Sequence, residues 1–303
     1  RDAQESRGLG DVYKRQFMMF AALLFGCSEH QLIEDITETS RTKTMKETGL
    51  ASVDIDALVA RARWGDGEAF LQLADCYKDG IGVQSDLLGM MYMVAQARAL
   101  GAIEYENDYL LRISDDNAFK FLFELLNKNP RELREKKDSI LPRLNMLDSP
   151  DALAISGIVS IENGDSVKGL EKIRKAAQNG SNFAILLNAS LDKNGELNPD
   201  IHQLEQVAER VPLAYKMLGK IYLNSDKDGN IDEKRAAYYY QKAEKHALLF
   251  KREAKWLLSY HNNGGEIQLD NEDVRRLQAF VRSTHERENI IVADTICVDS
   301  TTK

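Results

Sequence analysis

The polar stretch at residues 224–232 has the spacing of a calcium-binding loop. Acidic or amide side chains stand at its positions 1, 3 and 5, Gly229 stands at position 6, and an acid returns at position 9. Such oxygens suit calcium, and the glycine permits a sharp turn. Position 12 is Arg235, however, where a bidentate Glu should complete the coordination.

We therefore predict no metal site here and interpret the stretch as a connector between two helices. In this interpretation Gly229 lies in the turn and Asp232 is the N-cap of the second helix. Calcium stays the alternative, and a gain of stability on adding calcium that is lost in Asp228→Ala would support it.

The other residue types that support catalysis do not occur at catalytic spacings. The five histidines are scattered, with no H-E-x-x-H motif and no C-x-x-C partner. Ser40 and Lys43 have S-x-x-K spacing, but no S-D-N or K-T-G motif supports them. No phosphate-binding glycine loop is present, and no carboxylate pair has the apolar and aromatic context that raises a pKa. We predict that the protein is not an enzyme and uses no cofactor.

The overall charge argues against nucleic acid as a partner. The chain has 303 residues with 40 basic and 48 acidic side chains, so its formal net charge is −8. Nucleic-acid binding depends on neutralising phosphates with basic side chains. Charged residues are 29% and hydrophobic residues 43% of the chain, a balance that fits a soluble helical body.

The N-terminal residues have the features of a leader. Residues 1–16 do not begin with Met and are similar to translated sequencing-adaptor read-through; a genuine basic leader is the alternative. Residues 17–26 are a run of ten apolar residues, too short to span a bilayer but typical of a signal-peptide h-region. Residues 24–27 resemble the bacterial lipobox, which ends in a lipidated cysteine.

The lipobox resemblance implies lipidation of Cys27 and a place in the bacterial cell envelope, at the outer membrane. Each buried CH₂ of an acyl chain contributes ~0.8 kcal/mol to membrane binding. A buried apolar helix with an incidental cysteine is the alternative. The polar residues 27–53 are then expected to tether the following domain to the membrane.

Two later stretches share one spacing of residues. In each, Leu lies four and Tyr eight residues after an Ala, and a small residue lies fifteen residues after an Asp. Internal similarity of this kind indicates a structural repeat. The matching residues are Ala69, Leu73, Tyr77, Asp86 and Gly101 in the first stretch, and Ala214, Leu218, Tyr222, Asp232 and Ala247 in the second.

Each stretch predicts two helices joined by a turn. Residues four apart lie on one face of a helix, so the Ala, Leu and Tyr form a stripe. Beside the stripe, the small Ala74 or Gly219 lets a neighbouring backbone approach closely. Gly80 and Gly82 permit a turn with positive φ, and the Asp of each stretch is expected to cap the second helix.

These residues resemble the Sel1-like repeat, a relative of the tetratricopeptide repeat. Its pattern is A-x3-L-G-x2-Y-x2-G-x-G-V-x2-D, followed by A, W-Y, K-A-A and G. Residues 80–83 match the glycine loop, and residues 239–243 match the W-Y-x-K-A run. Met90 and Met93 depart from the pattern, since they stand where the family has Ala and Trp.

Partial units extend the resemblance along the chain, at residues 152–180, 184–200 and 254–270. The resemblance implies an all-α fold, a right-handed α-solenoid of stacked helix-turn-helix repeats over residues 54–286. A first helix near residue 55 is expected to cap the stack. Residues 287–303 form a tail that is extended over the last repeat or disordered.

The repeat pattern fails over residues 102–150. Helical runs are expected at 109–111, 119–126 and 133–147, with Pro142 bending or ending the third. Divergent repeats explain this section, and a specialised recognition insert is the alternative. Cys76 is expected to face the core, and no disulfide with Cys297 is predicted, since it would cross the whole stack.

The family resemblance favours a membrane-tethered scaffold that binds a protein or peptide on its concave face. First-helix side chains face that side in a curved stack. The candidate partner-binding residues are Gln72, Tyr215, Lys216 and Lys220. The alternative is an envelope module that captures a glycan or another small molecule, for which residues 238–240, three consecutive tyrosines, offer a stacking platform.

Overall fold

The computed structural model describes residues 53–115, 117–126, 130–224 and 231–283. Within these ranges the regular secondary structure is entirely helical, which confirms the predicted all-α class, and the only strand-like pairing is an isolated bridge between Leu191 and Leu197. No helix among the described residues is both long enough and apolar enough to cross a membrane. The predicted leader, h-region, Cys27, nearly all of the tether and the tail lie outside these ranges.

The described residues form fifteen helices, and most helices pack against the next one in the chain. They are α2 (Ile55–Arg63), α3 (Gly67–Asp79), α4 (Leu87–Ala99), α5 (Glu106–Leu110), α6 (Ala118–Leu126), α7 (Pro130–Glu135), α8 (Lys137–Met146), α9 (Pro150–Glu162), α10 (Ser166–Gln178), α11 (Asn182–Ser190), α12 (Ile201–Val207), α13 (Leu213–Leu223), α14 (Glu233–Glu244), α15 (Lys251–Asn262) and α16 (Asn271–Arg282).

Aspartates begin the second helix of successive pairs. The side chains of Asp86 and Asp232 accept backbone N–H groups at the starts of α4 and α14, which confirms both predicted N-caps. The same residue type caps α10, α12 and α16, at Asp165, Asp200 and Asp270. An N-cap acceptor satisfies a donor that the first helical turn leaves unpaired, and Asp54 and Asp66 do the same for α2 and α3, so Asp is the recurring N-cap of this fold.

Glycines bring paired helices into close contact. A Cβ at Gly219 of α13 would lie 2.5 Å from the Tyr240 ring of α14, so the small residue there makes room for a ring rather than for the expected backbone. In α9, a Cβ at Gly157 would lie 2.7 Å from the backbone oxygen of Gly169 in α10. These pairs therefore pack at distances that a larger side chain would not allow.

Residues 102–150 form α5, α6, α7 and α8, and many of their apolar side chains are buried, although Leu111 and Met146 are exposed. The expected helix at 133–147 is divided at Lys136. Pro142 lies inside α8, which continues to Met146, so of the two expected outcomes it does not end the helix, and a bend there stays a prediction. Burial of Ile140 and Leu144, at 5% and 2% exposure, offsets the hydrogen bond that the proline cannot donate.

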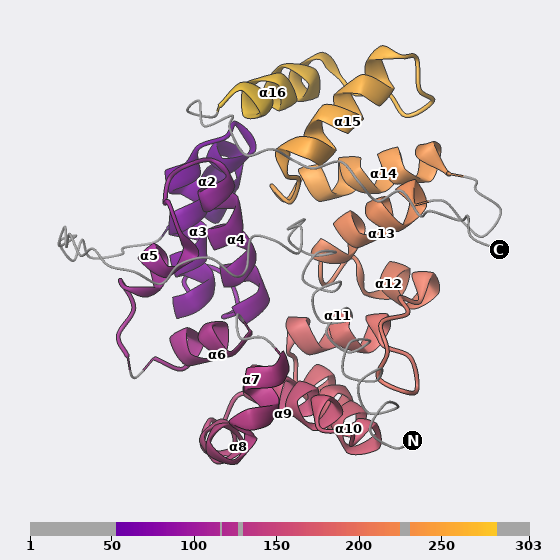
Figure 1. The fold of residues 1–303 in the computed structure, drawn as a ribbon. Coiled ribbons are helices and arrows are strands. Elements are labelled where there is room, and N and C mark those ends of the chain that lie inside the picture. The colour runs from indigo at the N-terminus through magenta and orange to yellow at the C-terminus, as the bar shows by residue number, and fades with distance from the viewer. Residues whose placement is uncertain (1–52, 116, 127–129, 225–230, 284–303) are drawn as a thin grey trace, which may run out of the picture.

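The two ends of the helical array meet. Figure 1 shows α16 beside α2, and the two helices are in contact. Glu244 of α14 accepts hydrogen bonds from Arg63 at 3.1 and 2.7 Å and from Arg276 of α16 at 2.9 and 3.2 Å. Helix α2 packs on α3 and is itself in contact with α16, so the N-terminal and C-terminal ends of the array are adjacent.

Candidate functional site

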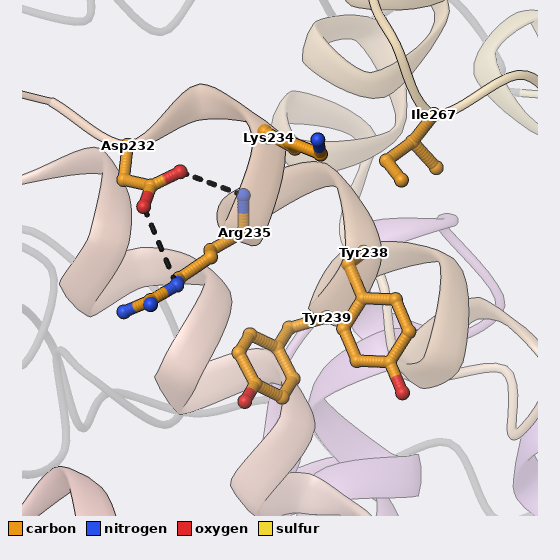
Figure 2. Close-up of a pocket in the computed structure, with 6 residues that line it drawn as sticks. All are labelled: Asp232, Lys234, Arg235, Tyr238, Tyr239 and Ile267. Carbon is orange, nitrogen blue, oxygen red and sulfur yellow. Dashed lines mark hydrogen bonds and ion pairs between the residues drawn. The ribbon is translucent and has the colours of Figure 1, made fainter.

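A surface pocket of about 470 Å³ opens beside the N-terminal half of α14 (Figure 2). Helix α14 contributes its N-cap residue and two turns of side chains, and the loop between α15 and α16 contributes an apolar side chain. We call this the tyrosine pocket. Its lining residues are Asp232, Lys234, Arg235, Tyr238, Tyr239 and Ile267.

Helix capping and helical spacing position these side chains. Asp232 accepts the backbone N–H of Arg235 at 2.9 Å, which starts α14. Lys234 and Tyr238 lie four residues apart, so they project from the same face one turn from each other. Ile267 then faces them from the loop before α16, as Figure 2 shows.

The tyrosine rings of α13 and α14 hold Tyr239 in place. Its ring stacks on Tyr222 at a centroid distance of 5.7 Å and 6° between planes, and on Tyr215 at 6.3 Å and 24°. Its hydroxyl donates to Glu205 at 2.6 Å. Burial and this carboxylate raise the pKa of Tyr239 above its ordinary value, so the hydroxyl stays protonated at physiological pH.

Tyr238 is the part of this cluster that faces solvent. Its ring meets Tyr239 edge-on, at 5.1 Å and 73°, and the residue is 44% exposed. An exposed tyrosine whose ring is supported from one side has lost part of its freedom before any ligand binds. Tyr238 is therefore the central contact that the pocket offers.

The charged side chains around the pocket are paired with one another. Arg235 lies 3.5 Å from Asp232, Lys234 pairs with Glu266, and Lys242 lies 3.6 Å from Glu209. All three pairs are largely solvent-exposed, and such pairs stabilise a fold by about 0–1 kcal/mol. Asp232, Arg235 and Lys234 line the pocket, so its rim offers both hydrogen-bond donors and acceptors.

This chemistry suits non-covalent binding. The pocket offers an aromatic ring, an aliphatic side chain and paired charges, and its lining contains neither Ser, Cys nor His. Tyrosine and arginine are enriched among residues that carry binding energy at protein interfaces.

The candidate partner-binding residues do not form one surface. Gln72 is exposed on α3, where it accepts a hydrogen bond from Arg61, whereas the other three lie on α13, across the molecule in Figure 1. Tyr215 is only 6% exposed and Lys220 is half-buried. Whether Gln72, Tyr215 and Lys220 contact a partner stays a prediction.

The expectation that Lys216 faces a partner is wrong, because its side chain is completely buried. Its ammonium donates to the Tyr92 hydroxyl at 2.7 Å and lies 3.7 Å from the Phe250 ring centroid and 3.7 Å from Glu253. Gln96 completes the cluster by donating to the Leu249 carbonyl at 2.8 Å. The cluster joins α4, α13 and α15, so Lys216 is an internal cation.

Of the three consecutive tyrosines, Tyr240 is 1% exposed and belongs to the core, while Tyr239 has ring neighbours on both sides. A stacking platform is thus reduced to Tyr238. The sequence does not indicate Ile267, because nothing local shows that the loop before α16 forms the opposite wall. Lys234 has the pattern of an ordinary exposed helical lysine and becomes part of a pocket only through that loop.

A buried carboxylate pair is also present, contrary to our expectation. Asp86 and Asp151 are each 9% exposed, and Asp86 accepts a hydrogen bond from Asn182 at 3.1 Å. Burial and the charge of Asp151 raise the pKa of Asp86 to about 6. Neither side chain lines the tyrosine pocket.

A lysine and two serines meet between α9 and α10. Lys172 donates to Ser156 at 2.8 Å and to Ser160 at 3.1 Å, and burial lowers the pKa of the lysine. A lysine beside a hydroxyl can activate a nucleophile, but Ser156 is only 1% exposed. The contact satisfies buried hydroxyls.

No group of three or more metal-ligating side chains occurs among the residues that the structure describes. Residues 225–230 lie outside that part, so the calcium alternative stays untested. Cys76 is a free, buried thiol, as its core position predicted. Cys297 lies outside the described ranges, and the lack of a disulfide between the two stays a prediction.

In comparisons with family models, curated proteins and solved structures, the chain matches none of them. The fold and the tyrosine pocket therefore define the protein as an all-helical array of paired helices with an aromatic surface pocket.

Proposed function

We propose that the protein is a Sel1-like repeat scaffold of the bacterial cell envelope that binds a protein or peptide segment in the tyrosine pocket. The observation that carries this proposal is the exposed, supported ring of Tyr238 beside Ile267 and the paired Arg235. Interface residues that contribute most to affinity are aromatic or Arg side chains in supported positions.

The repeat part of the proposal is supported by the succession of helix pairs with Asp N-caps and close glycine contacts. Right-handed stacking and the Sel1-like relationship are parts of the same proposal. Repeat arrays of this kind present side chains on large curved surfaces, which suits binding of other chains.

Attachment to the envelope membrane through a lipid on Cys27 is proposed from the lipobox-like residues 24–27 alone. Metabolic labelling with a clickable fatty acid tests it, in a bacterial host, on the native sequence preceded by an intact leader. Labelling of the wild type that is lost in Cys27→Ser would support lipidation of Cys27. Equal labelling of the wild type and Cys27→Ser would contradict it.

Site-specific photo-cross-linking tests the binding function. A photoreactive amino acid at position 238 should trap one partner from envelope extract. The control position is 105, where the native residue is also an exposed tyrosine, at the N-cap of α5; Figure 1 shows α5 on the opposite side of the molecule from α14. Equal amounts of cross-linked partner from positions 238 and 105 would contradict the proposal. A partner that is trapped from position 238, and less so when Arg235→Ala is added, would support it.

Capture of a saccharide is the second candidate, and the exposed ring of Tyr238 is the observation that favours it. An open aromatic face can stack on the apolar face of a sugar. A glycan array with the wild type and Tyr238→Ala separates the two functions, because only a saccharide module would give ring-dependent spots.

A further inference from the structure

Helix α4 contacts the later helices through two polar side chains that lie one turn apart. Tyr92 donates its hydroxyl to the Leu248 carbonyl at 2.6 Å, and Gln96 donates to the Leu249 carbonyl at 2.8 Å. Residues four apart lie on one face of a helix, so these side chains reach two successive carbonyls in the segment between α14 and α15. We call the residues that receive them the α4 receptor, which consists of Lys216, Leu248, Leu249 and Phe250.

The backbone just before these carbonyls is held in an unusual conformation. Ala247 has a φ of 57°, and no other non-glycine residue in the described part of the chain has a positive φ. At the matching position of the first repeat the residue is Gly101, with a φ of 77°. A side chain in this region of φ strains the backbone, and such strain is found at binding sites more often than elsewhere. The receptor is therefore the strained segment to which a binding role can be assigned.

The charged groups of the receptor keep partners of their own when α4 is disregarded. Lys216 lies 3.7 Å from Glu253 of α15, so its ammonium retains a carboxylate. In the same way, Glu244 retains Arg276 at 2.9 Å without Arg63 of α2. A buried charge that lost its only partner would be strongly destabilising. The later helices can therefore lose α2 and α4 without leaving either charge unpaired.

The fit of α4 in its receptor is incomplete. Gln96 is completely buried, and its Oε1 atom has no hydrogen-bond partner among the described residues. A buried acceptor without a donor gives up the hydrogen bonds that water would supply. Helix α4 thus occupies the receptor with a penalty that another helix need not have.

Helices α2, α3 and α4 form a unit that can leave the receptor together. Helix α4 packs mainly on α3, and α3 packs on α2. Besides the contacts of α4 just described, the hydrogen bonds from this unit to later helices include Arg63 to Glu244 at 2.7 Å and Asn182 to Asp86 at 3.1 Å. Polar interfaces within a chain resemble transient interfaces between proteins. The boundary between the unit and the later helices is of this kind.

We propose that the α4 receptor is a binding site for a helix that presents Tyr and Gln four residues apart, and that α4 blocks this site in the structure. The partner's tyrosine hydroxyl accepts from Lys216 and donates to the Leu248 carbonyl, and its amide donates to the Leu249 carbonyl. Its ring packs against Phe250, as the Tyr92 ring does at 5.5 Å. A helix laid along a receptor of this kind is a recurrent form of peptide recognition.

This site is separate from the tyrosine pocket, because no residue of the α4 receptor lines that pocket. A partner helix binds only to molecules in which the unit of α2, α3 and α4 has moved away. Its apparent affinity is therefore reduced by the fraction of molecules in that open state. Any change that weakens the hold of α4 should raise the affinity for the partner helix.

A labelled peptide with the sequence of residues 84–101 is the probe, and its binding to the full chain is measured by fluorescence polarisation. Tyr92→Phe in the protein weakens only the blocking helix and leaves the receptor intact. The peptide should bind this variant at least about tenfold tighter than the wild type. Peptides that carry Tyr92→Phe or Gln96→Glu should bind the same variant at least about tenfold more weakly, because each lacks one of the two donors.

Tyr109→Phe is the matched control. Tyr109 and Tyr92 are both 1% exposed, and the Tyr109 hydroxyl donates to Asp75 of α3 at 2.9 Å, away from the receptor. This control should leave the affinity for the peptide at the wild-type value. Hydrogen exchange gives a second measurement: in Tyr92→Phe, the amides of α2, α3 and α4 should exchange faster, while α9 and α10 keep their protection.

Four outcomes would overturn the inference. They are failure of the peptide to bind the Tyr92→Phe variant, an equal gain in Tyr109→Phe, equal binding of all three peptides, and unchanged hydrogen exchange in α4. The proposed function is tested separately, by cross-linking at position 238. A failure there would leave the α4 receptor standing, and a failure here would leave the tyrosine pocket standing.

Discussion

At the scale of single residues, the most unusual environment is that of Asp86. Its carboxylate caps α4 by accepting the Leu88 N–H at 3.1 Å, yet it is buried near a second carboxylate, Asp151. The hydroxyl of Ser181 donates to Asp151 at 2.5 Å. The pair lies where the first turns of α4, α9 and α11 meet, so its charge affects how three helices pack.

Protonation of Asp86 should couple stability to pH. The pKa of about 6 in the folded protein lies above the ordinary value of 3.8, so the folded state binds the proton more tightly. Its contribution to stability is present below about pH 4 and is lost as the pH rises through about 6. Between pH 4.5 and 7.5, this effect should lower the free energy of unfolding of the wild type by about 2 kcal/mol, and Asp86→Asn should abolish that decrease.

Urea unfolding at the two pH values measures this difference. The wild-type slope alone is not sufficient, because burial lowers the pKa of His246, which opposes Asp86 in this range. Asp200→Asn is the matched control, since Asp200 is an exposed N-cap whose pKa is lowered by hydrogen bonds from Gln203. Parallel pH dependences for wild type and Asp86→Asn would contradict the coupling.

Lys216 should behave as one half of a buried ion pair. Lys216→Met leaves Glu253 at 3% exposure without its cation, which costs about 3 kcal/mol or more. Adding Glu253→Gln should recover part of this loss, since an amide oxygen can still accept the Phe250 N–H. Chemical unfolding of the single and the double variant measures their free energies of unfolding. Equal losses of stability in the two would mean that Lys216 and Glu253 are not coupled.

At the scale of elements, close helix packing depends on glycine. Gly157 and Gly169 let α9 and α10 approach until a Cβ on one would lie 2.7 Å or less from the backbone of the other. Gly219 does the same for α13, where the obstacle is a tyrosine ring. A ring can shift, whereas a backbone carbonyl within a helix has little freedom.

Gly157→Ala should therefore destabilise the protein. Overpacking costs about 1–3 kcal/mol, which outweighs the helix propensity that alanine gains, at most ~1 kcal/mol. Thermal unfolding measures the effect. Val167→Ala on α10, where the side chain is 80% exposed, should stay within about 0.5 kcal/mol of wild type; a similar value for both variants would show that α9 and α10 are free to separate.

At the scale of the whole molecule, the array is closed rather than open. Simple repeat arrays have contacts only between neighbouring units. Here Glu244 joins Arg63 of α2 to Arg276 of α16, and the Tyr92 hydroxyl of α4 donates to the Leu248 carbonyl at 2.6 Å. Such contacts between distant parts of the chain make the two ends of the array depend on each other.

Glu244→Gln should loosen this closure. Two partly or fully buried guanidinium groups then lose the charge of Glu244 and keep Asp273 as the carboxylate partner that they share, at a cost of about 2 kcal/mol. Hydrogen exchange should show reduced protection in α2 and α16, with α9 and α10 retained. Glu266→Gln breaks an exposed pair and should change nothing; uniform loss of protection would instead mean that the array unfolds as one unit.

Much of the fold could be predicted from local patterns. The helix pairs around residues 69–99 and 214–244 follow from apolar side chains four residues apart, and their boundaries follow from Asp86 and Asp232. Both signals act within a few residues of the chain. The run of three tyrosines at residues 238–240, which includes Tyr238, is likewise visible in the sequence alone.

The misplaced residues all depend on distant neighbours. Lys216 has the sequence environment of an exposed helical lysine, but Tyr92 stands 124 residues away and closes over it. Asp86 has a raised pKa first because tertiary packing buries it and then because Asp151, from another helix pair, lies near it. Nothing within a helical turn of either residue indicates such a partner.

The amino-acid sequence alone determined the helical class, the pairing of successive helices and the aspartates that begin them, because hydrogen bonding and side-chain periodicity within a helix are short-range. Tertiary structure alone decided that α16 meets α2, that Lys216 is internal and that Ile267 faces Tyr238. Those outcomes depend on how small changes in packing accumulate over successive helix pairs, and no short segment contains that information.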